Sequence, residues 1–194
     1  MMTFRKALLI ATGVALGVMG AASITALAAD ATAPATSAYR DGAHDFDFNI
    51  GTWTTHIKAL QDPLGSTTWG EMTGTVTVRK IWGGKASMEE IEAGGKDGHF
   101  EGLTLFLYNP QSHQWSQTWV DSSNGAINKS AIGAFKDGRG ELISQDTLHG
   151  RTVLIRDVWS DIQPDSHHFE ESFSDDNGKT WQPDFVASLT RISP

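Results

Sequence analysis

The sequence contains no cysteine among its 194 residues. Disulfide scaffolds, thiolate metal sites and cysteine nucleophiles are therefore excluded. Basic residues are also few, because 15 Lys and Arg stand against 23 Asp and Glu, giving a formal net charge of −8. No basic cluster interrupts this acidic excess, so a phosphate backbone would be repelled and nucleic acid is not an expected partner.

Helical periodicity and the familiar catalytic motifs are missing as well. Beyond residue 44, no segment keeps apolar residues at helical spacing over three turns. The Gly-x-Ser-x-Gly elbow, the His-Glu-x-x-His zinc motif and the phosphate-binding glycine loop do not occur. In the predicted strand 167–174, His167 and Glu171 face one side while His168 and Glu170 face the other, so neither pair makes a metal site alone. No catalytic or metal-ligating residue is predicted.

The N-terminal residues have the pattern of a secretory signal peptide. Arg5 and Lys6 precede an uncharged run that ends at Ala26-Leu27-Ala28, a small-residue cleavage sequence. Cleavage after Ala28 predicts a periplasmic or secreted protein with no stable membrane anchor. The alternative is a retained anchor, since about 20 apolar residues span a bilayer.

The remaining 166 residues, after 28 of the 194 are removed, suit one domain. Residues 29–43 are small and lack apolar periodicity, so they are interpreted as a flexible linker. Residues 44–194 form the predicted barrel domain. Here short runs of β-branched and aromatic residues alternate with turn signals such as Asn109-Pro110 and Asp176-Asn177-Gly178. About ten strands are predicted: 51–60, 68–81, 86–93, 100–108, 114–121, 126–135, 139–147, 151–160, 167–174 and 180–191.

The first and last predicted strands carry a signature of barrel closure. Gly51-Thr52-Trp53 opens the first strand, and Trp53 falls on its more apolar face. Arg191, near the end of the last strand, also falls on an apolar face. A guanidinium that stacks on an indole is a stable way to seal a barrel floor. The predicted fold is therefore all-β, a single antiparallel barrel of roughly ten strands.

Several motifs together resemble a bacterial family of lipocalin-like (calycin-type) exported domains of uncharacterised function. The motifs are His44-Asp45-Phe46-Asp47-Phe48 with Gly51-Thr52-Trp53, Ile81-Trp82-Gly83-Gly84, Tyr108-Asn109-Pro110, Gln114 to Asp121, Arg156-Asp157-Val158-Trp159, Ser174-x-Asp176-x-Gly178-x-Thr180-Trp181 and Leu189-Thr190-Arg191. The resemblance covers nearly all of the chain after the signal peptide and implies a barrel with an internal cavity. The related nitrobindins bind haem through a His near the C-terminus, and the last strand here has none. That difference argues against haem, and no cofactor is expected.

The Ser174-x-Asp176-x-Gly178-x-Thr180-Trp181 motif fits the Asp-box pattern, which is a hairpin device. Gly or Asn accepts a positive φ in the turn while the Asp side chain caps backbone N–H groups. A single copy, without the repeats of a propeller, predicts a stable turn. A calcium loop is the alternative interpretation.

Four residues are predicted to contact a ligand. Gln117 and Trp119 share one strand face with Trp115, which suits the wall of an apolar pocket. Glu90 shares a strand face with Glu92, which is either a solvated outer face or an inward one. If it faces inward, Arg156 is its candidate partner, because buried charges are usually paired.

The leading hypothesis is a binding protein for a small, mostly apolar molecule. One alternative is a hydrolase or isomerase that uses Glu90 as acid or base in the same cavity. Another is a structural or interaction barrel whose core is filled by side chains.

Overall fold

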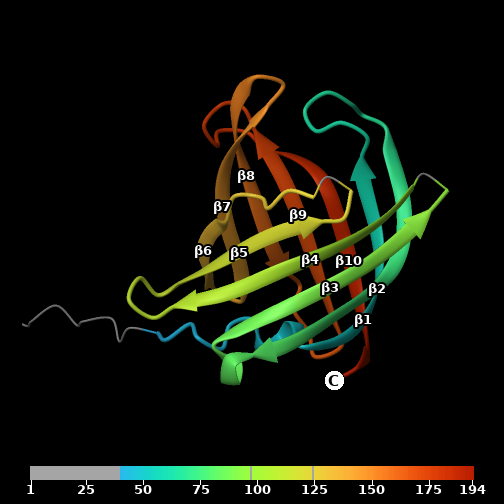
Figure 1. Cartoon of the computed structure of the whole chain (residues 1–194). Coiled ribbons are helices and arrows are strands. Elements are labelled where there is room, and N and C mark those ends of the chain that lie inside the picture. The colour runs from blue at the N-terminus through green and yellow to red at the C-terminus, as the bar shows by residue number, and fades with distance from the viewer. Residues whose placement is uncertain (1–39, 97, 124) are drawn as a thin grey trace, which may run out of the picture. The chain divides into compact units, whose positions relative to one another are not determined.

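The computed structural model describes residues 40–96, 98–123 and 125–194, and the predicted signal peptide lies outside the described residues. Ten antiparallel strands form a closed barrel in which each strand pairs with its sequence neighbours and β1 pairs with β10 (Figure 1). The predicted all-β, antiparallel barrel is confirmed. The helices in the described part are two short 3-10 turns, η1 (Asp47–Asn49) and η2 (Trp82–Gly84). Within those residues, no helix has the length and apolar character that crossing a membrane requires.

The strands follow the alternation and turn signals of the sequence closely. Their bounds are β1 Gly51–Leu60, β2 Trp69–Ile81, β3 Ala86–Gly95, β4 Gly98–Asn109, β5 Gln114–Asp121, β6 Ala131–Lys136, β7 Arg139–Leu148, β8 Arg151–Ser160, β9 Ser166–Ser174 and β10 Gln182–Ser193. The largest difference is at β6, which the sequence predicted to begin at residue 126. Residues 125–130 instead form an exposed connection, joined to β5 through a bridge between Ile127 and Val120.

The barrel interior contains two groups of buried apolar side chains. One gathers around Trp53 on β1 and includes Ile57, Val76, Val78, Ala93, Ala187 and Leu189. The other gathers around Phe46 and includes Phe106, Trp115, Ala131, Leu142 and Trp159. Because successive side chains of a strand point to opposite faces, every second residue of these strands lies inside.

The floor of the barrel is closed by Arg191 and Trp53, which are opposite each other in the β1–β10 register. The guanidinium carbon of Arg191 lies 3.9 Å from the centroid of the Trp53 ring. The same guanidinium donates hydrogen bonds to the carbonyls of Phe48, Ile50 and Pro164, at 2.6–2.7 Å. Arg191 therefore joins the last strand to the first strand and to the β8–β9 connection.

Gly51 allows this approach of Arg191. Its φ is +126°, and a Cβ at this position would meet the Arg191 guanidinium and the Ser193 carbonyl. Only glycine adopts such a backbone conformation readily. The glycine of the Gly51-Thr52-Trp53 sequence is therefore required by the close passage of the C-terminal strand.

Residues 40–50 cross the same end of the barrel as the C-terminus (Figure 1). Phe46 in this segment is 2% exposed and belongs to the interior apolar group. The Phe46 ring packs against the rings of Phe106, Phe135, Trp115 and Trp159, with centroids 4.6–5.0 Å apart. Three of these four contacts have the edge-to-face geometry that aromatic quadrupoles favour. Phe46 is thus an aromatic plug at this end.

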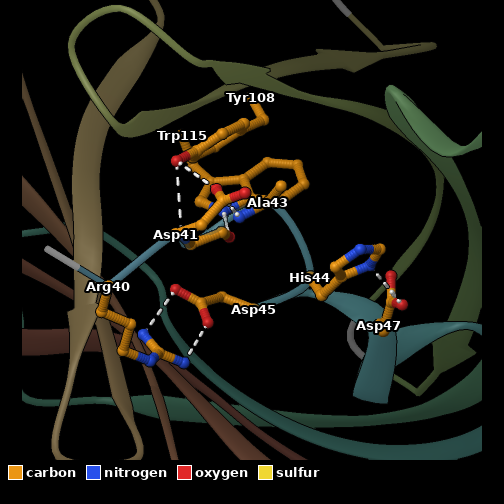
Figure 2. A network of polar contacts seen from close by, with 9 residues as sticks. Arg40, Asp41, Ala43, His44, Asp45, Asp47, Tyr108 and Trp115 are labelled. Carbon is orange, nitrogen blue, oxygen red and sulfur yellow. Dashed lines mark hydrogen bonds and ion pairs between the residues drawn. The ribbon is translucent and has the colours of Figure 1, made fainter.

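Polar contacts hold the residues that precede Phe46 in the sequence (Figure 2). The Tyr108 hydroxyl donates to Asp41 at 2.9 Å, and the Trp115 indole N–H donates to the Gly42 carbonyl at 2.9 Å. Arg40 forms an ion pair with Asp45. Residues 40–43, which the sequence placed in the flexible linker, are therefore bound to β4 and β5 by side chains of those strands.

The Asp-box segment is a hairpin turn between β9 and β10. Asp176 accepts hydrogen bonds from the backbone N–H groups of Lys179 and Thr180 and from the Thr180 hydroxyl, at 2.7–3.0 Å. These bonds lower the pKa of Asp176 to about 2. The carboxylate is occupied by the turn itself, as the hairpin interpretation predicts.

Candidate functional site: the internal cavity

The barrel encloses a cavity of about 380 Å³. Its lining comes from strands β1 to β10 and includes apolar, aromatic and polar side chains. Asp121, Ser123, Asn128, Lys129 and Asp146 line the part of the cavity at the strand ends away from Phe46. Lys129 and Asp146 form an ion pair there, at 3.1 Å. The cavity therefore extends from the plugged end toward a polar mouth at the opposite end.

Aromatic rings form a continuous wall of the cavity. Trp119, Phe100, Phe185, Phe169 and Trp159 follow one another around the interior, with neighbouring centroids 5.1–6.5 Å apart. Ring faces and edges of this kind bind apolar and aromatic bodies well.

Gly102 on β4 makes room for the Trp119 ring. A Cβ at Gly102 would overlap the six-membered ring of the Trp119 indole, which lies across the strand at this point. The glycine therefore permits the indole to lie against the barrel wall.

Two of the four residues predicted to contact a ligand line the cavity and two do not. Gln117 and Trp119 on β5 both face it. Glu90 lies on the outer surface, half exposed, and forms an ion pair with Arg79 at 2.7 Å rather than with Arg156. Arg156 stacks on Trp181 at 4.4 Å, and its closest ion pair is with Glu170 at 4.0 Å.

The reason for both differences is strand alternation. Glu89 on β3 and Asp157 on β8 line the cavity, so their sequence neighbours Glu90 and Arg156 lie on the outer side of the sheet. Glu90 and Arg156 therefore do not form a charged pair inside the barrel. Glu90 does not line the cavity, so it cannot act there as the suggested acid or base.

Glu89 is a partly buried carboxyl held by two neutral donors. The side-chain amide of Asn49 and the hydroxyl of Thr104 donate to its two oxygens, both at 3.1 Å. Burial raises the pKa of Glu89 and the two hydrogen bonds oppose that rise. Glu89 ties the N-terminal segment to β3 and β4 while one side of it faces the cavity.

Asp157 and Glu171 form a second acidic region on the cavity wall. They are direct cross-strand partners in the β8–β9 register and both line the cavity. Asp184 lies beside them in a bulge of β10, where the pairing to β9 shifts register between Pro183 and Phe185. Asp157 is 5% exposed and Asp184 is 7% exposed.

The pKa values of this carboxyl cluster, defined as Asp157, Glu171 and Asp184, all rise. Burial is the main cause for each of them. Charge repulsion from Glu171 adds to the rise for Asp157 and for Asp184, whose pKa reaches about 8. Protons are therefore retained in the cluster near neutral pH, because adjacent buried carboxylates resist ionising together.

His167 lies deeper in the cavity and is uncharged at neutral pH. It is 3% exposed, and its ring meets Trp53 edge to face with centroids 4.6 Å apart. Burial, followed by the nearby charge of Arg191, lowers its pKa to about 4. Neither ring nitrogen has a hydrogen-bond partner among the residues that the structure describes. A neutral imidazole offers one donor and one acceptor to whatever occupies the cavity.

We expect the protein to lose stability as the pH rises from about 6.5 to about 8. The Asp184 pKa rises from 3.8 to about 8 on folding, so its stabilising contribution is complete below 3.8 and is lost on the way to 8. The His167 pKa falls from 6.5 to about 4, so its contribution is complete above 6.5 and is lost as the pH falls. Of these two groups, only Asp184 therefore changes stability above pH 6.5.

Urea unfolding at several pH values measures this effect. The loss for the wild type should be roughly 1–2 kcal/mol over this interval, and Asp184→Asn should reduce it. Glu90→Gln, on the outer surface, should follow the wild type. An Asp184→Asn curve parallel to the wild-type curve would contradict the assignment.

Sequence reasoning missed Glu89, Asp157, Glu171 and His167 as cavity groups, and Asp184 as the third member of the carboxyl cluster. The sequence of β8 did indicate that Asp157 faces inward, because Asp157 shares a strand face with Val153 and Trp159, two residues that favour the interior. The cross-strand meeting of Asp157, Glu171 and Asp184 had no local signal, since the register and the β10 bulge place them together.

A candidate metal cluster lies on the outside of the barrel. Glu92, His99 and Glu101 place one ligand atom each within 4.8 Å of one another, and all three are exposed. Exposed acidic groups commonly lie together without an ion, so this arrangement does not define a metal site.

The chain belongs to a protein family defined by sequence. Residues 45–191 match the family described as "Protein of unknown function (DUF1579)". No curated protein matches the chain. The family assignment agrees with the resemblance to uncharacterised domains and gives no reaction or ligand.

Two solved structures are similar to this chain at low sequence identity. The structure of an S-type phycobiliprotein lyase, CPES, from Guillardia theta matches with a TM-score of 0.52 and 12% identity, over 77% of this chain and 91% of that one. A de novo designed fluorescence-activating β-barrel matches with a TM-score of 0.41 and 14% identity, over 79% of this chain and 99% of the design. At this identity the lyase likeness shows the fold alone.

Proposed function

We propose that this protein is an exported binding protein that holds a small molecule with a largely apolar body inside the barrel. The observation that carries the proposal is the cavity of about 380 Å³ with its continuous aromatic wall. Ligand pockets of about 300–1,000 Å³ are typical of drug-sized molecules. A barrel whose interior was filled by side chains would leave no such space. Export is supported by the sequence pattern of residues 1–28.

The architecture separates a structural end from a binding end. Phe46, Trp53 and Arg191 close one end with aromatic packing and hydrogen bonds to backbone carbonyls. The lining residues at the other end are small, polar or charged. A ligand would enter between these polar residues and place its apolar part against the aromatic wall.

Acid–base catalysis is a second candidate function, and the carboxyl cluster is the observation that favours it. Carboxyls with raised pKa values line the same cavity as a neutral imidazole, and perturbed titratable groups of this kind are common in acid–base sites. Mass spectrometry of a molecule incubated with the protein separates the two candidates. A binding protein returns the molecule unchanged, whereas an enzyme converts it.

The binding proposal is tested by a substitution that places a large side chain in the cavity. Ser144 on β7 lines the cavity, while its neighbour Ile143 points outward and is partly exposed. N-phenylnaphthylamine, whose fluorescence increases in apolar surroundings, serves as the probe. We expect Ser144→Trp to weaken probe binding about tenfold or more, because the added indole occupies ligand space.

The matched control is Ile143→Trp, which adds the same indole on the outer surface. This variant should bind the probe like the wild type. Absence of probe binding by the wild-type protein, or equal binding by both variants, would overturn the proposal. Native mass spectrometry of the protein as purified then identifies any molecule retained in the cavity.

A further inference from the structure

Within the described part of the chain, the buried polar atoms that line the cavity without a hydrogen-bond partner are mostly acceptors. They include Oδ1 of Asp157, Oε1 of Gln117, Oγ1 of Thr55 and both ring nitrogens of His167, and all four residues line the cavity. A buried acceptor without a donor is costly, by roughly 1–3 kcal/mol. The hydroxyl and the imidazole offer both roles, the amide oxygen accepts only, and the Asp157 carboxyl accepts only in the charged form that a bound cation would favour. The interior therefore suits an occupant that donates hydrogen bonds.

The charges that line the cavity point to the same class of ligand. Among the described residues, the cavity is lined by five carboxylic acids and one lysine. The acids are Glu89, Asp121, Asp146, Asp157 and Glu171, and the lysine is Lys129. Lys129 already forms an ion pair with Asp146 at the mouth. An anionic head group would meet net repulsion inside, whereas a cationic one would meet attraction.

We propose that the cavity selects a ligand with a protonated amine, which lies between Asp157 and Glu171 while its apolar body lies along the aromatic wall. This inference rests on the proposed binding function and specifies its ligand class. A primary ammonium supplies up to three donors, and each bond to a carboxylate is charge-assisted. Its positive charge also relieves the repulsion between the paired carboxyls.

The neighbouring rings suit the rest of an organic cation. Trp159 lies two residues after Asp157 on the same face of β8, and Phe169 lies two residues before Glu171 on the same face of β9. The centroids of these two rings are 5.1 Å apart. Aromatic faces attract cations as well as apolar surface, so ring and carboxyl contacts both favour an ammonium over a neutral group.

The arrangement favours an organic cation over a bound metal ion. Asp157, Glu171 and Asp184 do not form a group whose ligand atoms all lie within 4.8 Å of one another, whereas the exposed group Glu92, His99 and Glu101 does, among the described residues. Glu171 lies between the other two carboxyls and interacts with both. A line of acceptors matches the several donors of an amine better than it matches one small ion.

The test compares three probes that share one apolar body: naphthylmethylamine, naphthalenemethanol and naphthoic acid. Each is titrated into wild-type protein by calorimetry near pH 7, where an alkylamine is protonated. The amine should bind about tenfold tighter than the alcohol, since charge-assisted bonds contribute more than neutral ones. The acid should bind weakest, because the lining repels it.

Two variants locate the amine site and one serves as a matched control. Asp157→Asn and Glu171→Gln should each reduce the preference for the amine to about threefold or less, because each removes a charge while keeping the shape. Both variants should fold, since each removes a like charge from a buried pair. Glu90→Gln, on the outer side of β3, should keep the full preference.

Proton release gives a second measure at the same site. Amine binding should displace protons from the carboxyl cluster, which calorimetry in buffers of different ionisation enthalpy detects. The other titratable groups that face the cavity are Glu89, Asp121, Lys129, Asp146 and His167. Release by the wild type should therefore fall in Asp157→Asn and Glu171→Gln and remain in Glu90→Gln.

The outcomes separate this inference from the proposed function. Equal binding of amine and alcohol, or a preference for the acid, would overturn the inference and leave a cavity that binds apolar molecules. An amine preference that survives in both Asp157→Asn and Glu171→Gln would also overturn it. Failure of all three probes and of N-phenylnaphthylamine would overturn the proposed function, and the inference with it.

Discussion

Replacing Arg191 by methionine should lower the free energy of unfolding by about 4 kcal/mol, because one side chain makes three hydrogen bonds and a ring contact. Methionine keeps much of the apolar stem but leaves the carbonyls of Phe48, Ile50 and Pro164 without this donor. It also removes the charge that stacks on Trp53. Urea unfolding followed by tryptophan fluorescence measures the loss.

Arg191→Lys is the informative control. A lysine keeps the positive charge but cannot present a planar set of donors to three carbonyls, so its stability should lie between those of wild type and Arg191→Met. If Arg191→Lys equals the wild type, charge alone accounts for the effect. If Arg191→Met costs less than about 1 kcal/mol, the range of an ordinary surface change, the described barrel floor is not a major source of stability.

Phe46→Ala should cost about 4 kcal/mol as well, the usual range for removing a buried aromatic ring from a core. The Phe46 ring is 2% exposed and contacts rings from β4, β5, β6 and β8. These strands cannot move inward together to fill the space. For a domain of this size, the melting temperature should fall by roughly 10–15 °C, which calorimetry measures.

Phe48→Ala provides the comparison two residues along the same segment. Phe48 is partly buried, and its centroid distances to Phe46 and Phe135 are 6.0–6.1 Å. The loss from Phe48→Ala should be smaller than that from Phe46→Ala. The reverse order would show that residues 40–50 hold the barrel end through some contact other than the Phe46 plug.

The fold could be predicted because its signals are local. Turn residues recur between short runs of β-branched and aromatic residues. They mark the ends of nine of the ten strands to within about two residues. The exception is β6, which pairs with β5 through three residue positions, Ala131 to Gly133. Residues 126–130 were predicted as part of this strand and include the apolar residue Ile127. Ile127 forms only an isolated bridge to Val120, not the continuous backbone pairing of a strand.

The site was predicted only in part, because neighbouring residues of a strand point to opposite sides of the sheet and the sequence does not always mark which side is the interior. The run Met88-Glu89-Glu90-Ile91-Glu92 has a carboxyl on each face, so neither face is marked as interior. Glu89 is inside because Asn49 and Thr104, far away in the sequence, donate to it. Gln117 and Trp119 could be predicted as cavity residues because their strand has one clearly aromatic face.

Closure of the sheet has a consequence for an all-β protein that lacks disulfides. Each strand from β1 to β10 has a neighbour on both sides, so the ladder offers no continuous free edge to a second chain. Where β6 leaves β5 early, residues 127 and 128 cover the gap, and the Asn128 N–H donates to the Trp119 carbonyl at 3.0 Å. Sheet proteins aggregate most readily by strand addition at exposed edges. The same connection that borders the cavity mouth thus covers the stretch of β5 that β6 leaves unpaired.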